Sequence, residues 1–383
     1  MKISSPLPRR SRRLAFVVAL LTLLLTFCFS AKAFAVPSVS AKSAVLIEAE
    51  SGRVLYQQNA FVRLPMASTT KIMTALVAIR SGDIDRVVSI PAEATGIEGS
   101  SIYLYPGERL TLRQLIYALL LESANDAATA IAMEVAGSVA SFAALMNSTA
   151  TELGLTATHF TNPHGLDDGE HYTTAYDLAR IAAAALADPV FREICGTTRK
   201  TIPLKGEEGT RVLINHNKML TRYEGAIGVK TGFTKKSGRC LVSAAERDGL
   251  TLIAVTLCAP DDWNDHAAML DFGFEQYTRV RLTGEGEVYA RIPVLGSLLS
   301  FVQVKAANEV YYPLGPGEEL RKEVSLTQWI QAPVTRGQTA GTVTWYLGDQ
   351  VVAMCPLVYG GSVGLNVVNG RSFVQRMLDL FGP

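Results

Sequence analysis

A chain of 383 residues, of which 48% are hydrophobic and 19% charged, is long and apolar enough for two folded domains, which excludes an intrinsically disordered protein. The formal net charge is +1, but six of the 36 basic residues and none of the 35 acidic residues lie in the first 35 positions. The remainder is therefore slightly acidic, and we expect no nucleic-acid partner.

The N-terminus has the pattern of an export signal. Basic residues are concentrated in residues 2–13, and an apolar run of 16 residues follows at 14–29. Ala33 and Ala35 then supply small residues for cleavage before Val36. The run is short for a membrane span, which needs about 20 residues, although a retained anchor stays the alternative. Residues 1–35 are predicted to be a signal peptide and the processed protein to be exported.

Regular elements follow the signal in a clear order. Residues 43–58 alternate apolar and polar around Gly52, which predicts a hairpin. Helical spacing of apolar residues, with glycine or proline at several ends, then predicts five helices. They lie at 69–80, 112–122, 127–135, 142–153 and 174–187, the last opened by Thr174 and Asp177 in a sequence typical of a capping box. A strand meander is predicted at 225–234, 239–245 and 250–257, and a closing helix at 266–277.

Strands at both ends of this region, with helices between them, predict an α+β fold with one sheet covered by helices. After Thr278 the pattern changes to short alternating strands at 287–293, 301–304, 322–329 and 342–354. These predict a small all-β C-terminal domain. The expected division is a signal peptide at 1–35, a main domain at 36–277, a β-rich domain at 278–371 and an amphipathic tail at 372–383.

The first chemical motif is Ser68-Thr69-Thr70-Lys71 at the start of a helix. Residues three apart share a helix face, so the Lys71 amine can reach the Ser68 hydroxyl. A serine needs a base beside it to act as a nucleophile. Lysine serves as that base only if burial or a nearby cation lowers its pKa toward neutrality. The ordinary alternative is a helix cap with a surface lysine.

The second motif is Ser123-Ala124-Asn125, in a break between two predicted helices. A second hydroxyl can relay a proton to a leaving amine, which makes Ser123 a candidate catalytic residue. Asn125 is expected to hold Lys71 and to accept a substrate amide N–H. The alternative is simple capping, because serine and asparagine both favour helix starts.

The third motif is Lys230-Thr231-Gly232, followed by Phe233, on a strand expected at the edge of a cleft. Lys230 and the Thr231 hydroxyl can receive a substrate carboxylate, and Gly232 allows the substrate backbone to lie close to the strand. The N–H groups of Phe233 and Ser68 can form an oxyanion hole. Each motif is common when taken alone. Together, in this order, they match the set shared by penicillin-binding proteins and class A β-lactamases.

Residues 44–274 resemble the low-molecular-mass penicillin-binding proteins, which are serine-type D-alanyl-D-alanine carboxypeptidases that trim peptidoglycan stem peptides. The segments that carry the resemblance are 65–74, 121–128, 161–166 and 228–234. The β-rich region resembles the C-terminal domain of the same family. The resemblance implies a β-lactamase/transpeptidase-like fold, with stem peptides as substrates, β-lactam antibiotics as inhibitors and no cofactor.

By the same resemblance, Ser68 is the acylated serine, Lys71 its base, Ser123 the second catalytic serine and Lys230 a substrate contact. Two segments depart from the family. His216 stands where some relatives carry an arginine that meets the substrate carboxylate, and residues 261–265 are acidic where relatives are often basic. The carboxylate partner beyond Lys230 and Thr231 therefore stays open, and a different substrate preference is expected.

Three other functions stay open. A class A β-lactamase needs a glutamate followed four residues later by asparagine, whereas Glu170 is followed there by Thr174. A D,D-endopeptidase acting on cross-links would share the same motifs, and an inactive muropeptide-binding module is the non-enzymatic alternative. His159, His164 and His171 are spaced unlike a common metal site. We expect them to order a loop beside the cleft, with no metal.

The tail offers a membrane contact. Five apolar residues share one face of a helix, and Arg371 and Arg376 can meet anionic head groups. The five are Phe373, Val374, Met377, Leu378 and Phe381. The alternative is a helix packed on the β-rich domain. The expected location is the outer face of the cytoplasmic membrane or the cell wall.

Overall fold

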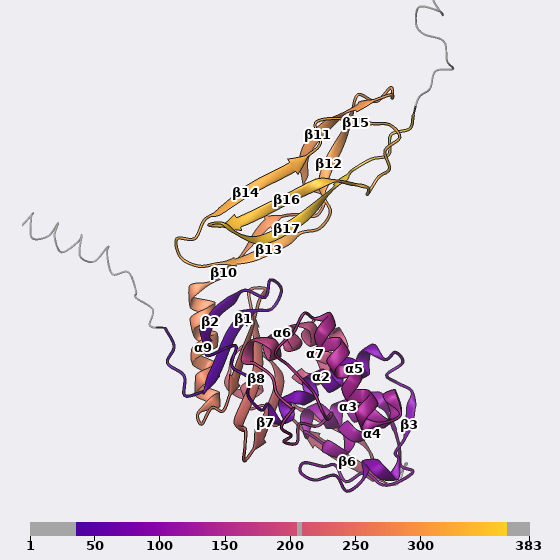
Figure 1. Cartoon of the computed structure of the whole chain (residues 1–383), viewed down its shortest axis with the longest axis vertical. Coiled ribbons are helices and arrows are strands. Elements are labelled where there is room, and N and C mark those ends of the chain that lie inside the picture. The colour runs from indigo at the N-terminus through magenta and orange to yellow at the C-terminus, as the bar shows by residue number, and fades with distance from the viewer. Residues whose placement is uncertain (1–35, 205–208, 366–383) are drawn as a thin grey trace, which may run out of the picture. The chain divides into compact units, whose positions relative to one another are not determined.

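The computed structural model describes residues 36–204 and 209–365. Its main sheet is antiparallel and has five strands in the order β2-β1-β9-β8-β7 (Figure 1). The strands are β1 (Ser43–Glu48), β2 (Val54–Gln58), β7 (Ala226–Thr234), β8 (Gly238–Arg247) and β9 (Leu250–Leu257). The predicted hairpin therefore joins the predicted meander, because β1 pairs with β9. One edge of the sheet is β7, the strand that carries Lys230 to Phe233.

The two faces of this sheet bury alternate residues of β1. Val45 and Ile47 pack into a helical core on one face, whereas Ala44 and Leu46 pack on the other. Helix α9 (Asp262–Gln276) covers that second face with Met269 and Leu270 (Figure 1). This alternation follows from the two-residue period of a strand. It confirms the predicted sheet covered by helices.

The helices of the first face agree closely with the predicted positions. They are α2 (Lys71–Arg80), α3 (Leu112–Leu121), α4 (Asn125–Ala136), α5 (Val139–Glu152) and α6 (Ala175–Leu186). Thr174 caps α6 by accepting the N–H of Asp177, but the reciprocal half of the predicted capping box does not form. The Asp177 carboxylate instead accepts the N–H of Ala157 and the hydroxyl of Thr158, so it ties a loop to the helix.

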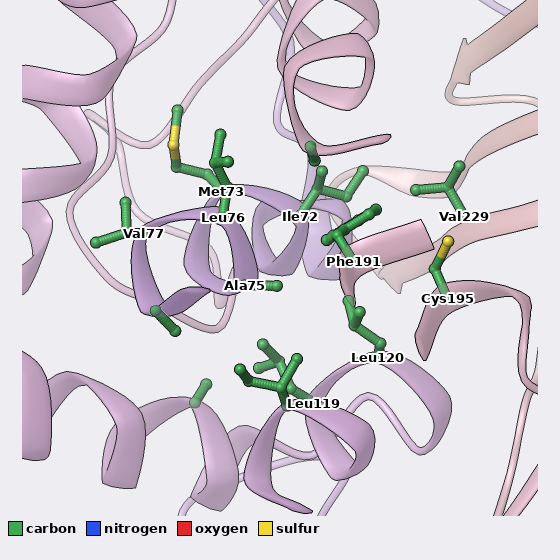
Figure 2. Packing of buried hydrophobic residues seen from close by; sticks show 14 of the residues in the cluster. Ile72, Met73, Ala75, Leu76, Val77, Leu119, Leu120, Phe191, Cys195 and Val229 are labelled. Carbon is green, nitrogen blue, oxygen red and sulfur yellow. The ribbon is translucent and has the colours of Figure 1, made fainter. Parts of the chain in front are cut away.

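Helix α2 is the centre of the helical layer, with every residue from Lys71 to Ile79 buried. Figure 2 shows its Ile72 and Leu76 among side chains from other elements. The labelled neighbours are Leu119 and Leu120 of α3, Phe191 and Cys195 of helix α7 (Pro189–Gly196), and Val229 of β7. Each buried aliphatic side chain contributes about 1.5–3 kcal/mol. This packing fixes the helix that follows Ser68.

Several short elements were not predicted. They are the strand pair β3 (Val87–Ser89) and β4 (Arg109–Thr111), helix α7 (Pro189–Gly196), the hairpin β5 (Arg199–Leu204) and β6 (Gly209–Ile214), and helix α8 (Met219–Arg222). Pro189 follows the predicted helix at 174–187, where proline is expected to end a helix. It also begins α7, because Asp188 caps the new helix and a proline at its first position lacks only an N–H that would have no intrahelical partner.

Residues 278–365 form a β-rich region with its own hydrophobic cluster around Val304, Val343, Trp345 and Leu357. Its strands are β10 (Thr278–Thr283), β11 (Val288–Leu295), β12 (Phe301–Ala306), β13 (Val310–Leu314), β14 (Leu320–Leu326), β15 (Ile330–Gln331), β16 (Thr339–Leu347) and β17 (Gln350–Tyr359). A six-stranded sheet has the order β14-β16-β17-β12-β11-β15, and β10 pairs with β13.

The single strand predicted at 342–354 is wrong. A turn at Gly348 and Asp349 divides that stretch between the antiparallel strands β16 and β17. Both strands carry alternating apolar residues. The alternation continues across Gly348 and Asp349, so the sequence pattern does not indicate a turn there. The predicted signal peptide at 1–35 and the tail at 372–383 lie outside the described residues.

Candidate active site

Ser68 lies in a 3₁₀ turn, η1 (Ala67–Thr70), which leads directly into α2. Two threonines brace this turn: the Thr69 hydroxyl donates to the Met66 carbonyl at 2.6 Å, and the Thr70 hydroxyl donates to the Ala67 carbonyl at 2.8 Å. Ala67 has φ of +47°, a left-handed conformation that is uncommon for a residue with a Cβ. Such conformations concentrate at functional sites, where the surroundings hold them in place.

The Lys71 amine makes three contacts. Its Nζ lies 3.0 Å from Ser68 Oγ, 2.7 Å from Asn125 Oδ1 and 2.6 Å from the His164 carbonyl oxygen. The latter two oxygens can only accept hydrogen bonds. A neutral amine has two N–H groups and one lone pair, so donation to both oxygens leaves the lone pair for the Ser68 hydroxyl. The geometry therefore orients Lys71 as a proton acceptor toward Ser68.

The electrostatic surroundings favour this neutral form. Complete burial lowers the pKa of Lys71 well below its ordinary value, and the positive charge of Lys230 lowers it further. The carboxylate of Asp126 acts in the opposite direction and is the weakest of the three influences. Burial also lowers the pKa of Lys230, to about 7. Both influences that the sequence suggested for Lys71, burial and a nearby cation, therefore act in the same direction.

Ser123 lies between α3 and α4 and has φ of +61°. Asn125 is the first residue of α4, and its side chain is buried. The Asn125 Oδ1 accepts from Lys71, and its Nδ2 donates to the Glu98 carbonyl at 2.6 Å. Both ends of the amide are therefore engaged within the protein. The structure thus places Asn125 where it holds Lys71, and its side chain lies outside the lining of the cavity described below.

Gly232 brings β7 against the nucleophile turn. A Cβ at this position would lie 3.0 Å from the Ser68 nitrogen and 3.1 Å from the Thr69 nitrogen. Separations this short would force the strand away from the turn. Gly232 therefore allows β7 to lie close to Ser68. The sequence predicts a different role for this glycine, namely that it allows a substrate to lie close to the strand. The Phe233 side chain, next along the strand, is exposed.

Lys230 is buried behind the strand, and its Nζ donates to the Thr231 carbonyl at 2.8 Å. Five of the predicted residues line a cavity of about 390 Å³: Ser68, Ser123, Thr231, Gly232 and Phe233. The remaining three, Lys71, Asn125 and Lys230, lie outside that lining. His216, Asp262 and Trp263 also line the cavity, and they belong to the two segments in which the sequence departs from the family. The sequence gives no indication of the other walls, which are Ser100, Lys218 and Arg239.

A loop at residues 161–171 contacts the nucleophile turn and Lys71. The Thr161 N–H donates to His171 Nδ1 at 3.1 Å, so Nε2 carries the proton and donates to the Thr70 hydroxyl at 2.8 Å. Burial lowers the pKa of His171 to about 4. The predicted role of the histidines in ordering this loop is confirmed for His171. Within the described residues, no cluster of three or more His, Cys, Asp or Glu side chains is arranged to hold a metal ion.

Asp126 holds another wall of the cavity and was not identified from the sequence. Its buried carboxylate accepts from the Ser101 hydroxyl at 2.6 Å and from the Leu104 N–H at 3.0 Å. These bonds fix the loop that follows Ser100, a residue of the cavity lining. The sequence signal for Asp126 is its position directly after Asn125, the last residue of the second motif.

Comparison with known proteins adds independent information. The family model for D-alanyl-D-alanine carboxypeptidase matches residues 30–261, and that for the penicillin-binding protein 5 C-terminal domain matches residues 277–364. The chain is 34% identical to D-alanyl-D-alanine carboxypeptidase DacF of Bacillus subtilis, covering 83% of this chain and 84% of the relative. It is 32% identical to D-alanyl-D-alanine carboxypeptidase DacC of Escherichia coli, covering 92% of each.

A solved structure shares the arrangement. Penicillin-binding protein 5 from Haemophilus influenzae superposes with a TM-score of 0.73 at 27% identity, covering 86% of this chain and 99% of that protein. The similarity therefore extends over both the main sheet with its helices and the β-rich region.

Proposed function

Because the chain belongs to the D-alanyl-D-alanine carboxypeptidase family of serine peptidases, we propose that it removes the terminal D-alanine from peptidoglycan stem pentapeptides through an acyl-enzyme on Ser68. The observation that carries this assignment is the contact of 3.0 Å between Lys71 Nζ and Ser68 Oγ, with the two other contacts of the amine made to carbonyl oxygens. These contacts hold the amine at the nucleophile, and its lowered pKa favours the neutral form that can act as a base.

In the proposed acylation step, Lys71 accepts the Ser68 proton as Oγ attacks the carbonyl carbon of the penultimate D-alanine. The N–H groups of Ser68 and Phe233 stabilise the oxyanion. The C–N bond then breaks, and Ser123 relays the proton held by Lys71 to the leaving amine of the terminal D-alanine, which restores the neutral Lys71 and the Ser123 hydroxyl. Water hydrolyses the resulting ester, which releases the shortened peptide and restores the Ser68 hydroxyl. The Thr231 hydroxyl on the cavity wall receives the terminal carboxylate.

The test uses penicillin, whose reactive amide and carboxylate resemble those of a D-alanyl-D-alanine end. Intact-mass analysis should show one adduct on the native protein and none on Ser68→Ala. Lys71→Ala should abolish the adduct while the melting temperature stays close to that of the native protein. An adduct that persists in Ser68→Ala would overturn the assignment of the nucleophile.

Product analysis separates the peptidase activities. A defined pentapeptide should lose one D-alanine, seen by mass spectrometry, whereas a cross-linked dimer should remain intact. Cleavage of the dimer with no effect on the pentapeptide would instead identify a D,D-endopeptidase. Binding of the pentapeptide without any cleavage or penicillin adduct would identify an inactive binding module.

A peptidoglycan substrate requires the enzyme to work outside the cytoplasm, and we propose that residues 1–35 are the export signal. The division into a peptidase domain at 36–277 and a β-rich domain at 278–371 belongs to the same proposal. It is supported by the separate hydrophobic cluster of the β-rich region. Among the described residues no single helix is long and apolar enough to cross a membrane, and only the pair α4 and α5, bent by 83°, passes when the two are joined.

We propose that residues 372–383 attach the enzyme to the outer face of the cytoplasmic membrane. Exposed apolar side chains in the β-rich region support this. Leu298 and Trp329 are 80% and 56% exposed, and Leu365, the last described residue before the tail, is half exposed and lies beside Gly296. Such side chains are suited to the same interface.

Sedimentation with vesicles of anionic phospholipid tests the attachment. The processed protein should sediment with the vesicles, and deletion after Asn369 should release it. Leu298→Ser should weaken the attachment of the full-length protein without abolishing it. Equal sedimentation of the full-length and truncated proteins would refute the role of the tail.

A further inference from the structure

Arg239 lies on the cavity wall beside the strand that holds the proposed oxyanion hole. It is the second residue of β8, and the register of the β7–β8 pair places it directly opposite Phe233. Arg239 also lines the same cavity as Thr231 and Phe233, so a peptide held along β7 in that cavity passes near the Arg239 wall. Thr231 lies two residues back on β7, about 7 Å along the strand.

Two residues of α9 hold the Arg239 side chain. Its Nη2 donates to Asp262 Oδ1 at 2.7 Å, and its guanidinium carbon lies 5.8 Å from the centre of the Trp263 ring. The Asp262 side chain is 4% exposed, whereas that of Arg239 is 43% exposed. The guanidinium is therefore anchored on one side and open to the cavity on the other. All three residues line that cavity.

The anchored guanidinium retains hydrogen-bonding capacity. Arginine has five N–H donors, and a carboxylate can accept two of them side by side. Within residues 36–204 and 209–365, the bond to Asp262 is the only hydrogen bond that this guanidinium donates. The remaining donors form a preorganised site for an anionic group, because their direction is fixed before a ligand arrives.

The charge of the cavity favours the same ligand. Arg239 neutralises Asp262, and Lys218 adds a further positive charge to the lining. Within the described part of the chain, Lys218 has no ion pair. The cavity lining therefore carries two basic side chains, Arg239 and Lys218, against the one carboxylate of Asp262, which favours an anionic group over a second cation at the lining itself.

The direction of the substrate decides which of its groups reaches Arg239. A peptide with its terminal carboxylate at Thr231 and its reactive carbonyl oxygen at the N–H of Phe233 runs antiparallel to β7. Its earlier residues then continue past Phe233. We infer that Arg239 binds a carboxylate on the side chain of the residue that precedes the D-alanyl-D-alanine unit. This inference rests on the proposed function, because the peptide direction follows from the proposed oxyanion hole.

The inference predicts a substrate class. Stem peptides carry a diamino acid before D-alanyl-D-alanine, and in some the side chain of that residue ends in a free carboxylate. We expect the enzyme to prefer such peptides over those in which the group is an amide or is missing. Arg239 would then act as a specificity-determining residue, since it binds a part of the substrate distant from the reacting atoms.

The sharpest probe is a pair of peptides that differ in one group. Diacetyl-meso-diaminopimelyl-D-alanyl-D-alanine with a free side-chain carboxylate is compared with the same peptide bearing a side-chain carboxamide. The native enzyme should hydrolyse the carboxylate form with kcat/KM about 10- to 100-fold higher, the range expected for hydrogen bonds to a charged group. Arg239→Gln should lose this preference, with kcat/KM for the carboxamide changed by about twofold or less.

Controls separate recognition from general effects. Lys218→Gln removes a positive charge from the same cavity and should retain the preference, whereas Arg239→Lys should retain only part of it because lysine cannot bind bidentately. Equal rates for the two peptides with the native enzyme would overturn the inference and need no variant. An equal loss on both peptides in Arg239→Gln would also overturn it, since that result indicates a structural role.

Failure of the proposed function gives a different result. In that case the native enzyme would release D-alanine from neither peptide and would form no penicillin adduct. With the adduct and the hydrolysis of both peptides observed, the ratio of their kcat/KM values tests Arg239 alone.

Discussion

Replacing Gly165 with alanine is predicted to disable the nucleophile without altering any proposed catalytic side chain. Gly165 is buried and has φ of +89°. A Cβ there would overlap the carbonyl oxygen and carbon of Ala67 and lie 2.9 Å from Thr70 Oγ1. Real Cβ atoms essentially never approach another heavy atom within 3.0 Å. The residue immediately before Ser68 must therefore move.

The size of the effect follows from the two contributions. The left-handed conformation costs a residue with a Cβ about 1–2 kcal/mol, and overpacking adds about 1–3 kcal/mol. The overlap with Ala67 requires a displacement on the order of 1 Å, which at an active site lowers the rate by about 100-fold. We expect the second-order rate of acylation by penicillin to fall by about that factor, and the melting temperature to fall by about 5–15 °C.

Stopped-flow acylation and thermal unfolding measure these two quantities. Gly169→Ala is the matched control, because it lies in the same connection, is exposed and has no heavy atom within 4 Å of the new Cβ. It should change neither quantity appreciably. Acylation at the native rate by Gly165→Ala would refute the reasoning, because it would show that Ala67 tolerates the displacement.

Three further predictions concern buried ionisable groups. Lys230→Met removes the cation that lowers the pKa of Lys71, so the acid limb of the pH–rate profile for acylation should move to higher pH. Removal of a buried amine should also raise the free energy of unfolding by about 2 kcal/mol. An acid limb at the native pH would contradict the role of Lys230. Asp126→Asn removes the charge that raises the pKa of Lys71, so the acid limb of the pH–rate profile should move to lower pH. The free energy of unfolding should fall by about 2 kcal/mol, because the hydrogen bonds to the loop that follows Ser100 are weakened. A shift of the acid limb to higher pH would contradict this prediction. The pKa of His171 falls on folding from 6.5 to about 4, so the unfolded chain binds more protons between these values and stability is lost as pH falls from about 6.5 to about 4. Equilibrium unfolding of His171→Gln should show a weaker loss, by on the order of 3 kcal/mol over that range, and an identical pH dependence would exclude His171 as the cause.

The main fold was predictable because apolar periodicity and turn residues carry it. The alternation of apolar and polar residues predicts β1 and β2, and helical spacing of apolar residues predicts α2, which is buried on all sides. Prediction failed where one signal had two meanings. Proline at position 189 ends one helix and begins another, and the pattern of β16 continues through Gly348 into β17.

The site was predictable as far as it depends on side-chain chemistry. Ser68 and Lys71 follow from their spacing, and the lowered pKa of Lys71 follows from burial. The His164 carbonyl that orients the amine left no signal, because every residue has a carbonyl and only tertiary structure brings one to Nζ. Arg239 was missed for a different reason. Its place opposite Phe233 depends on the register of the β7–β8 pair, and the predicted bounds of the two strands do not determine that register.

The strand order of the main sheet also determines when the enzyme can finish folding. Strand β9 lies between β1 and β8, so residue 43 pairs with residue 257. The β1–β2 hairpin therefore has no place in the sheet until nearly the whole domain has been synthesised. Closing so long a loop slows folding, because its entropy is lost before the contacts form. A chain arrested before β9 would carry Ser68 and Lys71, yet it would lack the strand that joins the two halves of the sheet.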